Sequence, residues 1–408
     1  MASNTSTNLT TDKITEEMQR VLHSKAQFLG SINKQYDNSF AQEGAKIGAS
    51  LRIRLPRKYT VQSGAALSTE EPQENSVTLP VSSQRHVDTT FTTADMALDI
   101  DRFSERIVVP AMSQLAAFVD NDLLSMYSSV APSVGTPGTA PTTLLPFGQG
   151  RAKMNQQATP KDGDRCVLID SDVSATLTNG LKGLFQDSTS ISRQYLEGMI
   201  GRGSGFDFLE SELLNTHTNG AFAGTVVIND ASIATGQTSI GMDAFTDAAP
   251  TIKKGDVFTV AGVFDVHPET KQAYSSLKQF VVTADATGSS NAIAAVNFRP
   301  AINLTGVYQN ISALPLDNAA VTFVGTASTT YQNSLAFHKN AFTCASADLL
   351  MPNDVHNKSR VVFEDISMRV LTQYTISSDA MPTRIDVLYG YVMAADVNRE
   401  PQACRIWG

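Results

Sequence analysis

The chain has 408 residues, of which 42% are hydrophobic and 17% are charged. This balance excludes a disordered or fibrous protein, because disordered chains are rich in charge and poor in apolar side chains. The formal net charge is −9, so the chain lacks the basic footprint of a general nucleic-acid binder.

The first 10 residues are polar, and an amphipathic helix is predicted over residues 14–22. Ile14, Met18, Val21 and Leu22 recur at helical spacing and share one face. Such a helix buries little by itself. We therefore expect it to dock on the rest of the chain or on a neighbouring chain.

Residues 51–55 and 77–81 alternate apolar and polar side chains, which predicts two strands. A polar stretch separates them, so the region from 50 to 90 is typical of a long two-stranded excursion. An isolated two-stranded hairpin is marginally stable in water. Something outside the hairpin is therefore expected to support it.

Four cations lie close together on this excursion: Arg52, Arg54, Arg57 and Lys58. Three interpretations are open: a charged edge that prevents strand aggregation, an ion-pair strip that meets an acidic neighbour, or direct contact with nucleic acid. Arg102, Glu105 and Arg106 either pair along a helix or hold the base of the hairpin. The further candidates for contacts between subunits are the acidic residues of the polar stretch, Glu70, Glu71 and Glu74.

The strongest helical pattern follows this region. Apolar residues recur at steps of three and four between Phe103 and Met126, with Pro110 among them. Proline is tolerated in a first helical turn, so we predict a short helix over 101–108 and a long one from Pro110 to about Ser128. A loop rich in Pro, Gly and Thr is expected over 131–146.

Mixed structure is predicted next. Residues 166–169 form an apolar run typical of a buried strand, and Asp172 is expected to cap a helix that continues to about Leu184. The glycine-rich residues 198–205 predict a mobile turn. They lack the spacing of a dinucleotide-binding loop.

From about residue 221 to 330 the helical periodicity disappears and short β runs separated by turn residues replace it. This pattern predicts a sandwich or small barrel. Mixed sequence stands on both sides, so the block is interpreted as an insertion into a host domain. The predicted strands are 225–228, 257–263, 280–283, 294–298 and 321–324.

The C-terminal region alternates again. Residues 366–376 and 385–393 predict a long antiparallel pair joined by 377–383, and 404–407 predict a last short strand.

No chemistry-bearing motif stands out. The six histidines form no HExxH pattern, and there is no nucleophile elbow and no phosphate-binding loop. The three cysteines have neither metal spacing nor a disulfide framework. No signal peptide or membrane span is predicted. We therefore expect no enzyme, no catalytic residue, no metal and no cofactor.

Three segments carry a resemblance to a known family: DRFSERIVVPAMSQLAAFVDND at 101–122, IKKGDVFTVAGV at 252–263 with LKQFVV at 277–282, and NSLAFHKNAFT at 333–343. In this order they resemble the major capsid (coat) proteins of tailed bacteriophages. The similarity is greater to coat proteins of short-tailed Salmonella phages, which carry an inserted β domain, the I-domain. Residues 229–252 are short and mostly neutral, so no charged I-domain loop toward a neighbour is expected.

The resemblance implies an α+β protein of the Hong Kong 97-type capsid fold with an inserted all-β I-domain barrel. It implies an N-arm over 1–36, an E-loop region over 37–97, P- and A-domains over 98–220 and 331–408, and the I-domain over 221–330. The implied partners are further copies of the chain in hexamers and pentamers, a scaffolding protein, a portal protein and, non-specifically, packaged double-stranded DNA. No membrane partner is implied.

The expected function is therefore that of a major capsid protein of an icosahedral phage head, assembled in the bacterial host cytoplasm and located in the virion. The alternative is a virion-surface or secreted β-rich protein that binds a receptor. It explains the β block but neither the long helix nor the cysteine pattern.

Overall fold

The computed structural model describes residues 22, 26–37, 50–59, 61, 64–65, 67, 75–92, 109–181, 200–363 and 365–408. The chain divides into two compact units, which are described separately. The first contains Met1–Ile53, Thr78–Leu124 and Phe342–Val392, and the second contains Arg54–Val77, Ser125–Ala341 and Met393–Gly408. Leu22 is helical and buried, whereas the rest of the predicted helix at 14–22 and the short helix at 101–108 lie outside the described residues.

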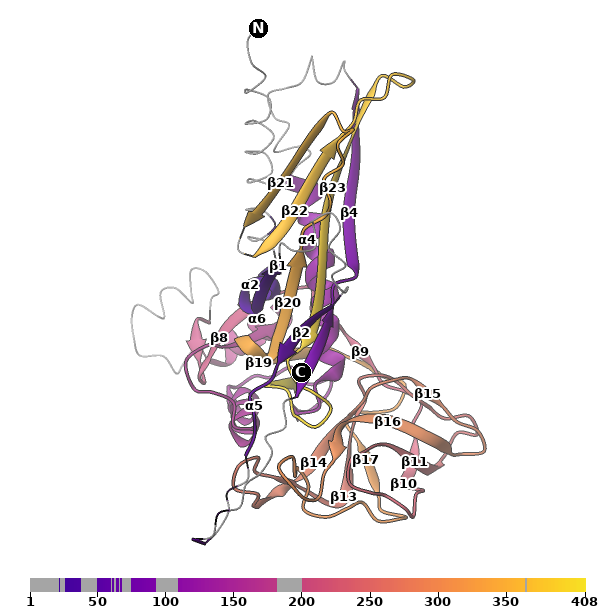
Figure 1. Cartoon of the computed structure of the whole chain (residues 1–408). Helices are drawn as coiled ribbons and strands as arrows, with labels where there is room; N and C mark the ends of the chain where they lie inside the picture. Colours follow the sequence, from indigo (N-terminus) through magenta and orange to yellow (C-terminus); the bar gives the residue numbers. More distant parts are fainter. Residues whose placement is uncertain are drawn as a thin grey trace. The chain divides into compact units, whose positions relative to one another are not determined.

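The first unit is built on a six-stranded sheet. Its order is β1 (Asn33–Asp37), β20 (Phe342–Ala347), β23 (Ala380–Met393), β22 (Ile366–Thr372) and β21 (Asn357–Phe363), and β4 (Ser83–Thr92) also pairs with β23. The strands β21, β22 and β23 lie side by side in Figure 1. The predicted C-terminal pair is confirmed, with Met368 opposite Val387 in the antiparallel ladder. Its connection is 373–379 and not 377–383, because β22 ends at Thr372 and β23 already begins at Ala380.

Two helices accompany this sheet. The predicted long helix is confirmed as α4 (Val109–Leu124), which continues into the 3-10 turn η4 (Ser125–Ser129) in the second unit. Its apolar face buries Met112, Leu115, Val119 and Leu123. The short helix α2 (Gln27–Ser31) packs against α4.

The predicted strands at 51–55 and 77–81 are confirmed as the pair β2 (Ser50–Arg54) and β3 (Ser76–Pro80). The excursion does not continue to residue 90 as predicted, because β4 already pairs with β23 in the main sheet from Ser83 onward. The apolar side chains of the hairpin have support within the chain. Leu79 and Val81 are buried in a cluster with Ala345 and Ala347 of β20, and Leu51 and Ile53 pack against that cluster. The hairpin is therefore not isolated at its root.

The second unit contains a second six-stranded sheet. Its order is β5 (Ser133–Gly135), β24 (Ala403–Trp407), β19 (Asn333–His338), β6 (Arg165–Ile169), β8 (Phe206–Glu210) and β7 (Arg202–Gly203). Both β6 and β24 were predicted. The helices α5 (Leu145–Gln156) and α6 (Ser171–Leu181) contribute Phe147, Met154, Val173 and Leu177 to the cluster that covers this sheet.

Two local predictions need correction. The expected loop ends early, because α5 begins at Leu145 with Pro146 in its first turn, where a missing N–H costs nothing. Asp172 lies inside the first turn of α6, which begins at Ser171, and does not cap it. The predicted turn in the glycine-rich segment is present: from Ile200 onward the segment is a β-hairpin turn, with positive φ angles at Ser204 and Gly205.

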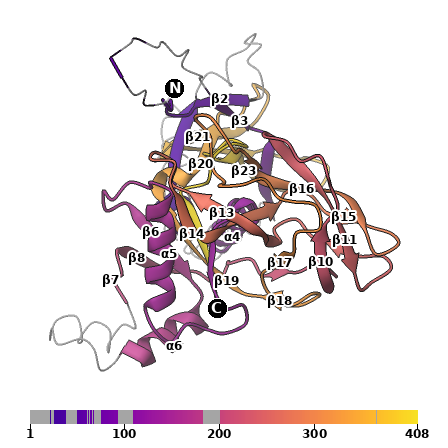
Figure 2. The same ribbon diagram turned by 90° about the horizontal axis from the view of Figure 1, so that it is seen from below.

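The β block forms a third six-stranded sheet, which also belongs to the second unit (Figure 2). Its order is β10 (Gly224–Ile228), β11 (Gln237–Phe245), β16 (Ile293–Ile302), β14 (Ala273–Val282), β13 (Val257–Val266) and β17 (Val321–Phe323). A bridge from Val227 to Ala320 brings the two edges together, so the sheet nearly closes into a barrel. Short ladders flank it: β9 (His217–Thr218) with β18 (Thr330–Tyr331), and β12 (Thr251–Ile252) with β15 (Ala286–Thr287).

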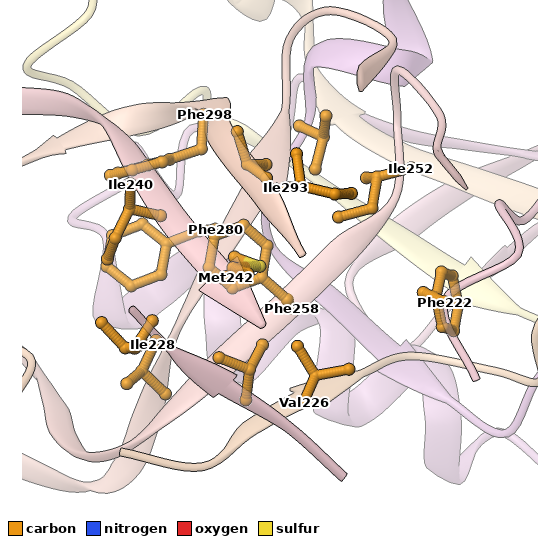
Figure 3. Packing of buried hydrophobic residues seen from close by; sticks show 14 of the residues in the cluster. Phe222, Val226, Ile228, Ile240, Met242, Ile252, Phe258, Phe280, Ile293 and Phe298 are labelled. Carbon is orange, nitrogen blue, oxygen red and sulfur yellow. The ribbon is translucent and has the colours of Figure 1, made fainter. Parts of the chain in front are cut away.

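The interior of this barrel is apolar and aromatic. Figure 3 shows Phe258, Phe280 and Phe298 converging with Ile240 and other aliphatic side chains. The centroids of the Phe280 and Phe298 rings are 5.2 Å apart in an edge-to-face arrangement. Such pairs stabilise a core beyond the area that they bury.

All five predicted strands of the block are present, but β11 was missed. Gly241 interrupts its alternation, and a register shift lies between Ile240 and Met242. A Cβ at Gly241 would stand 2.5 Å from the carbonyl oxygen of Asn229, so the close approach of two backbones requires glycine there.

Candidate functional site: contact surfaces and buried polar joints

The predicted basic strip lies where the alternation placed it. Arg52 and Arg54 are exposed on β2, while Leu51 and Ile53 point toward the apolar cluster. Arg57 is exposed and Lys58 is half-buried just beyond the strand. The remaining candidates, Glu70, Glu71, Glu74, Arg102, Glu105 and Arg106, lie outside the described residues.

Exposed apolar side chains accompany the strip. Tyr59, Val61 and Leu67 are 68%, 92% and 91% exposed. Single exposed apolar residues are ordinary, but three within nine positions of a solvent-facing loop are typical of a contact surface. The loop therefore combines charge with uncovered apolar area.

Lys58 is held in a cationic environment. Its ammonium lies 5.8 Å from the centroid of the Tyr308 ring, and the guanidinium of Arg399 lies at the same distance from that ring. Burial, together with Arg399 and Lys271, lowers the pKa of Lys58 to about 8. The sequence signalled the cluster of charges on the loop but not its aromatic and basic neighbours.

A buried ion triad joins the β block to its host. Lys278 of β14 is 2% exposed, and its ammonium lies 2.9 Å from Asp265 and 2.6 Å from Glu400. Burial alone would lower the pKa of Lys278, but the two carboxylates raise it overall. Lys153 of α5 adds a weaker contact, 3.9 Å from Asp265.

A second buried cation, Arg405 of β24, also links the two sheets of the second unit. Its guanidinium donates to the carbonyl oxygens of Val130 (2.9 Å) and Gly255 (2.8 Å). It also lies 5.4 Å from the centroid of the Trp407 ring. Burial lowers the pKa of Arg405 to about 10, and the carbonyl and aromatic contacts offset that desolvation.

In the first unit, a carboxylate fixes the short helix α2 to α4. Asp120 is fully buried and accepts the backbone N–H groups of Phe28 (3.2 Å) and Leu29 (3.0 Å). Burial raises the pKa of Asp120 to about 6, although these hydrogen bonds favour the charged form. The helix α4 therefore holds the first turn of α2 through one side chain.

Another carboxylate anchors the β4–β23 ladder to α4. Asp122 receives a bidentate contact from Arg85, with distances of 2.7–3.0 Å, and the hydroxyl of Tyr389 donates to it at 2.6 Å. The phenol of Tyr389 is almost wholly buried, and its pKa is raised by that burial and by Asp122. These hydrogen bonds therefore hold α4 against β4 and β23.

The histidine that most resembles a catalytic group is structural in its surroundings. His217 donates to or accepts from Asp256 at 2.8 Å, and Tyr127 lies 3.4 Å from its other ring nitrogen. Asp256 also accepts the backbone N–H groups of Gly220 (3.2 Å) and Lys253 (2.8 Å). The dyad thus closes the junction between β9 and the start of β13.

The described residues contain no cluster of His, Cys, Asp and Glu that would hold a metal ion. Burial raises the pKa of Cys344 and of Cys404 to about 12, which disfavours the reactive thiolate. Among the helices that the structure describes, none has the length and apolar character needed to cross a membrane.

Comparison with known proteins identifies one family. The family model described as "P22 coat protein - gene protein 5" matches residues 28–397, which is most of the chain. A search of curated proteins found no match.

Solved structures of low sequence identity are also similar. A protein of Mycobacterium phage Che8 is 12% identical, with a TM-score of 0.46, covering 93% of this chain and 90% of that one. The asymmetric unit of the bacteriophage PhiM1 mature capsid gives 12% identity and a TM-score of 0.44, with 92% and 85% covered. The capsid structure of the Cyanophage P-SCSP1u gives 12% identity and a TM-score of 0.42, covering 94% of this chain and 88% of that one.

Proposed function

Since this chain belongs to the P22 coat protein family, and is therefore the major capsid protein of an icosahedral phage head, we propose that its mechanism is self-association without any catalytic step. The observation that carries this proposal is the loop beyond β2 and β3. It presents the exposed Arg54 and Arg57 together with the uncovered Tyr59, Val61 and Leu67. Such a surface gains its free energy by lying on a neighbouring subunit.

The α+β architecture with an all-β insertion agrees with the expected Hong Kong 97-type arrangement. We retain the proposed boundaries: an N-arm over 1–36, an E-loop over 37–97, P- and A-domains over 98–220 and 331–408, and an I-domain over 221–330. In this scheme the E-loop extends from β2 and β3, its root is formed by residues 55–58 and Asn75 next to these strands, and α4 is the spine helix. The nearly closed barrel between Gly224 and Phe323 supports an independently packed I-domain.

The partners proposed beyond other copies are a scaffolding protein, a portal protein and packaged DNA held only non-specifically. Assembly is placed in the cytoplasm of the bacterial host. The acidic balance supports weak DNA contact, because a net charge of −9 disfavours tight binding of phosphate.

Particle formation tests the function. The full chain is expressed with and without its scaffolding protein, and the products are sized by sedimentation and negative-stain microscopy. Closed shells tens of nanometres across are expected. A stable monomer or small oligomer under both conditions would contradict self-assembly.

The basic strip has its own test. Arg52→Glu and Arg54→Glu together should impair shell formation, because an ion-pair strip that meets an acidic neighbour becomes repulsive. The isolated subunit should keep its wild-type melting temperature, since both side chains are exposed. Normal shells from the double variant would refute the ion-pair interpretation.

A further inference from the structure

The segment before β24 contacts the I-domain through its backbone. Arg299 of β16 donates to the carbonyl oxygens of Ala395 (3.0 Å) and Asp396 (2.9 Å). The N–H of Ala301 donates to the carbonyl oxygen of Val397 at 2.8 Å. Residues 395–397 are therefore fixed to the I-domain barrel.

The same segment also contacts the root of the E-loop. The side-chain amide of Asn75 donates to the carboxylate of Asp396, and the guanidinium of Arg399 donates to the carbonyl oxygen of Pro56. The N–H of Leu55 donates to the carbonyl oxygen of Asn75 at 2.9 Å, which closes the two ends of the loop on each other. Consistently, Arg54–Val77 belongs to the compact unit that contains the I-domain.

Tyr308, on a loop of the I-domain, completes this arrangement. Its ring lies 5.8 Å from both the Lys58 ammonium and the Arg399 guanidinium. Lys271 holds the ring-bearing loop by donating to the carbonyl oxygens of Val307 (2.7 Å) and Gln309 (3.4 Å). An aromatic face attracts cations, so one ring accommodates two like charges that would otherwise repel each other.

We propose that Tyr308, Asp396 and Arg399 form a latch that fixes the root of the E-loop, at Pro56, Lys58 and Asn75, to the I-domain. The I-domain then sets the direction in which the loop leaves the subunit. Tyr308 is a positioning residue for shell assembly, acting through Lys58 and Arg399.

The contacts of the latch are of kinds that can break and form again. The latch consists of hydrogen bonds to a carbonyl oxygen and to the Asp396 carboxylate and of cation–π contacts. Partly exposed cation–π contacts are individually weak. The latch can therefore open and close again without unfolding either the barrel or the β2–β3 pair.

The role of the latch in assembly rests on the proposed function, in which the E-loop lies on a neighbouring subunit. The experiment therefore tests the latch in the isolated subunit and its role in assembly separately. Tyr308→Leu removes the aromatic face and keeps apolar bulk, whereas Tyr308→Phe keeps the ring and is the matched control. Hydrogen exchange of the isolated subunit is measured at the Leu55 amide. The same variants are assembled into shells and their diameters are measured.

In Tyr308→Leu, exchange at Leu55 should rise by about tenfold, the change expected from losing two weak cation–π contacts. Exchange in β13 and β14 should stay unchanged, and the shells should become heterogeneous in diameter. Tyr308→Phe should behave as wild type in all three measurements. Unchanged exchange and uniform shells in Tyr308→Leu would overturn the latch.

If Tyr308→Leu does not fold, Asn75→Ala tests the other side, because it deletes the Asp396 contact and leaves the I-domain intact. Its exchange at Leu55 should rise as well, and no rise would overturn the proposal. Failure of the wild-type chain to form shells would instead refute the proposed function. The exchange comparison would still decide whether the latch exists.

Discussion

Removing the ammonium of Lys278 should be among the most damaging single changes in this protein. In Lys278→Met the carboxylates of Asp265 and Glu400, which lay 2.9 and 2.6 Å from the ammonium, are left facing each other with little water. Breaking a buried ion pair from one side costs about 3–5 kcal/mol. Lys153 lies 3.9 Å from Asp265 and offsets part of this loss, so we expect about 3 kcal/mol.

The reasoning depends on uncompensated charge, so a triple variant is the control. Lys278→Met combined with Asp265→Asn and Glu400→Gln removes all three charges and retains most of the volume. Replacing a complete buried ion group by neutral residues is often nearly neutral, so its free energy of unfolding should return to within about 1 kcal/mol of wild type.

The assay is urea unfolding of the isolated subunit, followed by the fluorescence of Trp407. This is the only tryptophan in the sequence, it is 2% exposed, and it contacts Arg405 at the junction with the I-domain. A loss below about 1 kcal/mol in the single variant would refute the argument from buried charge. A triple variant as unstable as the single one would refute it too.

Two further predictions follow from the first unit. Burial raises the pKa of Asp120 to about 6, so the folded protein binds this proton more tightly than the unfolded chain does. The stabilisation that results is present below about pH 4 and is lost as the pH rises to 6. In urea unfolding between pH 4 and 6, the stability of Asp120→Asn relative to wild type should therefore rise by about 1.4 kcal/mol per pH unit, whereas a constant difference would contradict the assignment. Gly390→Ala should lower the melting temperature and cost at least about 2 kcal/mol, because its Cβ would stand 2.1 Å from the carbonyl oxygen of Pro80. Gly30→Ala, which has open space around the added methyl, should change stability by less than about 1 kcal/mol, and equal melting temperatures for the two variants would refute the steric argument.

Periodicity in the sequence was sufficient for the strongly patterned elements. The alternation of β2, β22 and β23 and the three-and-four spacing of α4 follow from burying one face of a strand or helix, so these elements were predictable. Strands without that pattern were not. Glycine interrupts β11, and β4 is mostly polar because its backbone pairs with β23 while most of its described side chains remain at least partly exposed.

The site divides along the same line. The exposure of Arg52 and Arg54 was predictable, because the alternation within β2 alone shows which positions face the solvent. The burial of Lys278, Asp120 and Arg405 is not visible there, since a charged residue enters a core only when distant segments supply its partners. Asp120 accepts a hydrogen bond from Leu29 of α2, 91 residues away in the sequence, and Arg405 donates one to Gly255, 150 residues away.

The sequence by itself therefore determined the class of the protein, its β insertion and the exposed basic positions on and beyond β2, because local patterns encode which faces are buried. Only the tertiary structure decided how the parts of the second unit are joined. The Lys278 triad, the Arg405 contacts and the arrangement around Tyr308 each require residues that are brought together by folding. Long-range electrostatic pairing leaves no periodic trace in a single sequence.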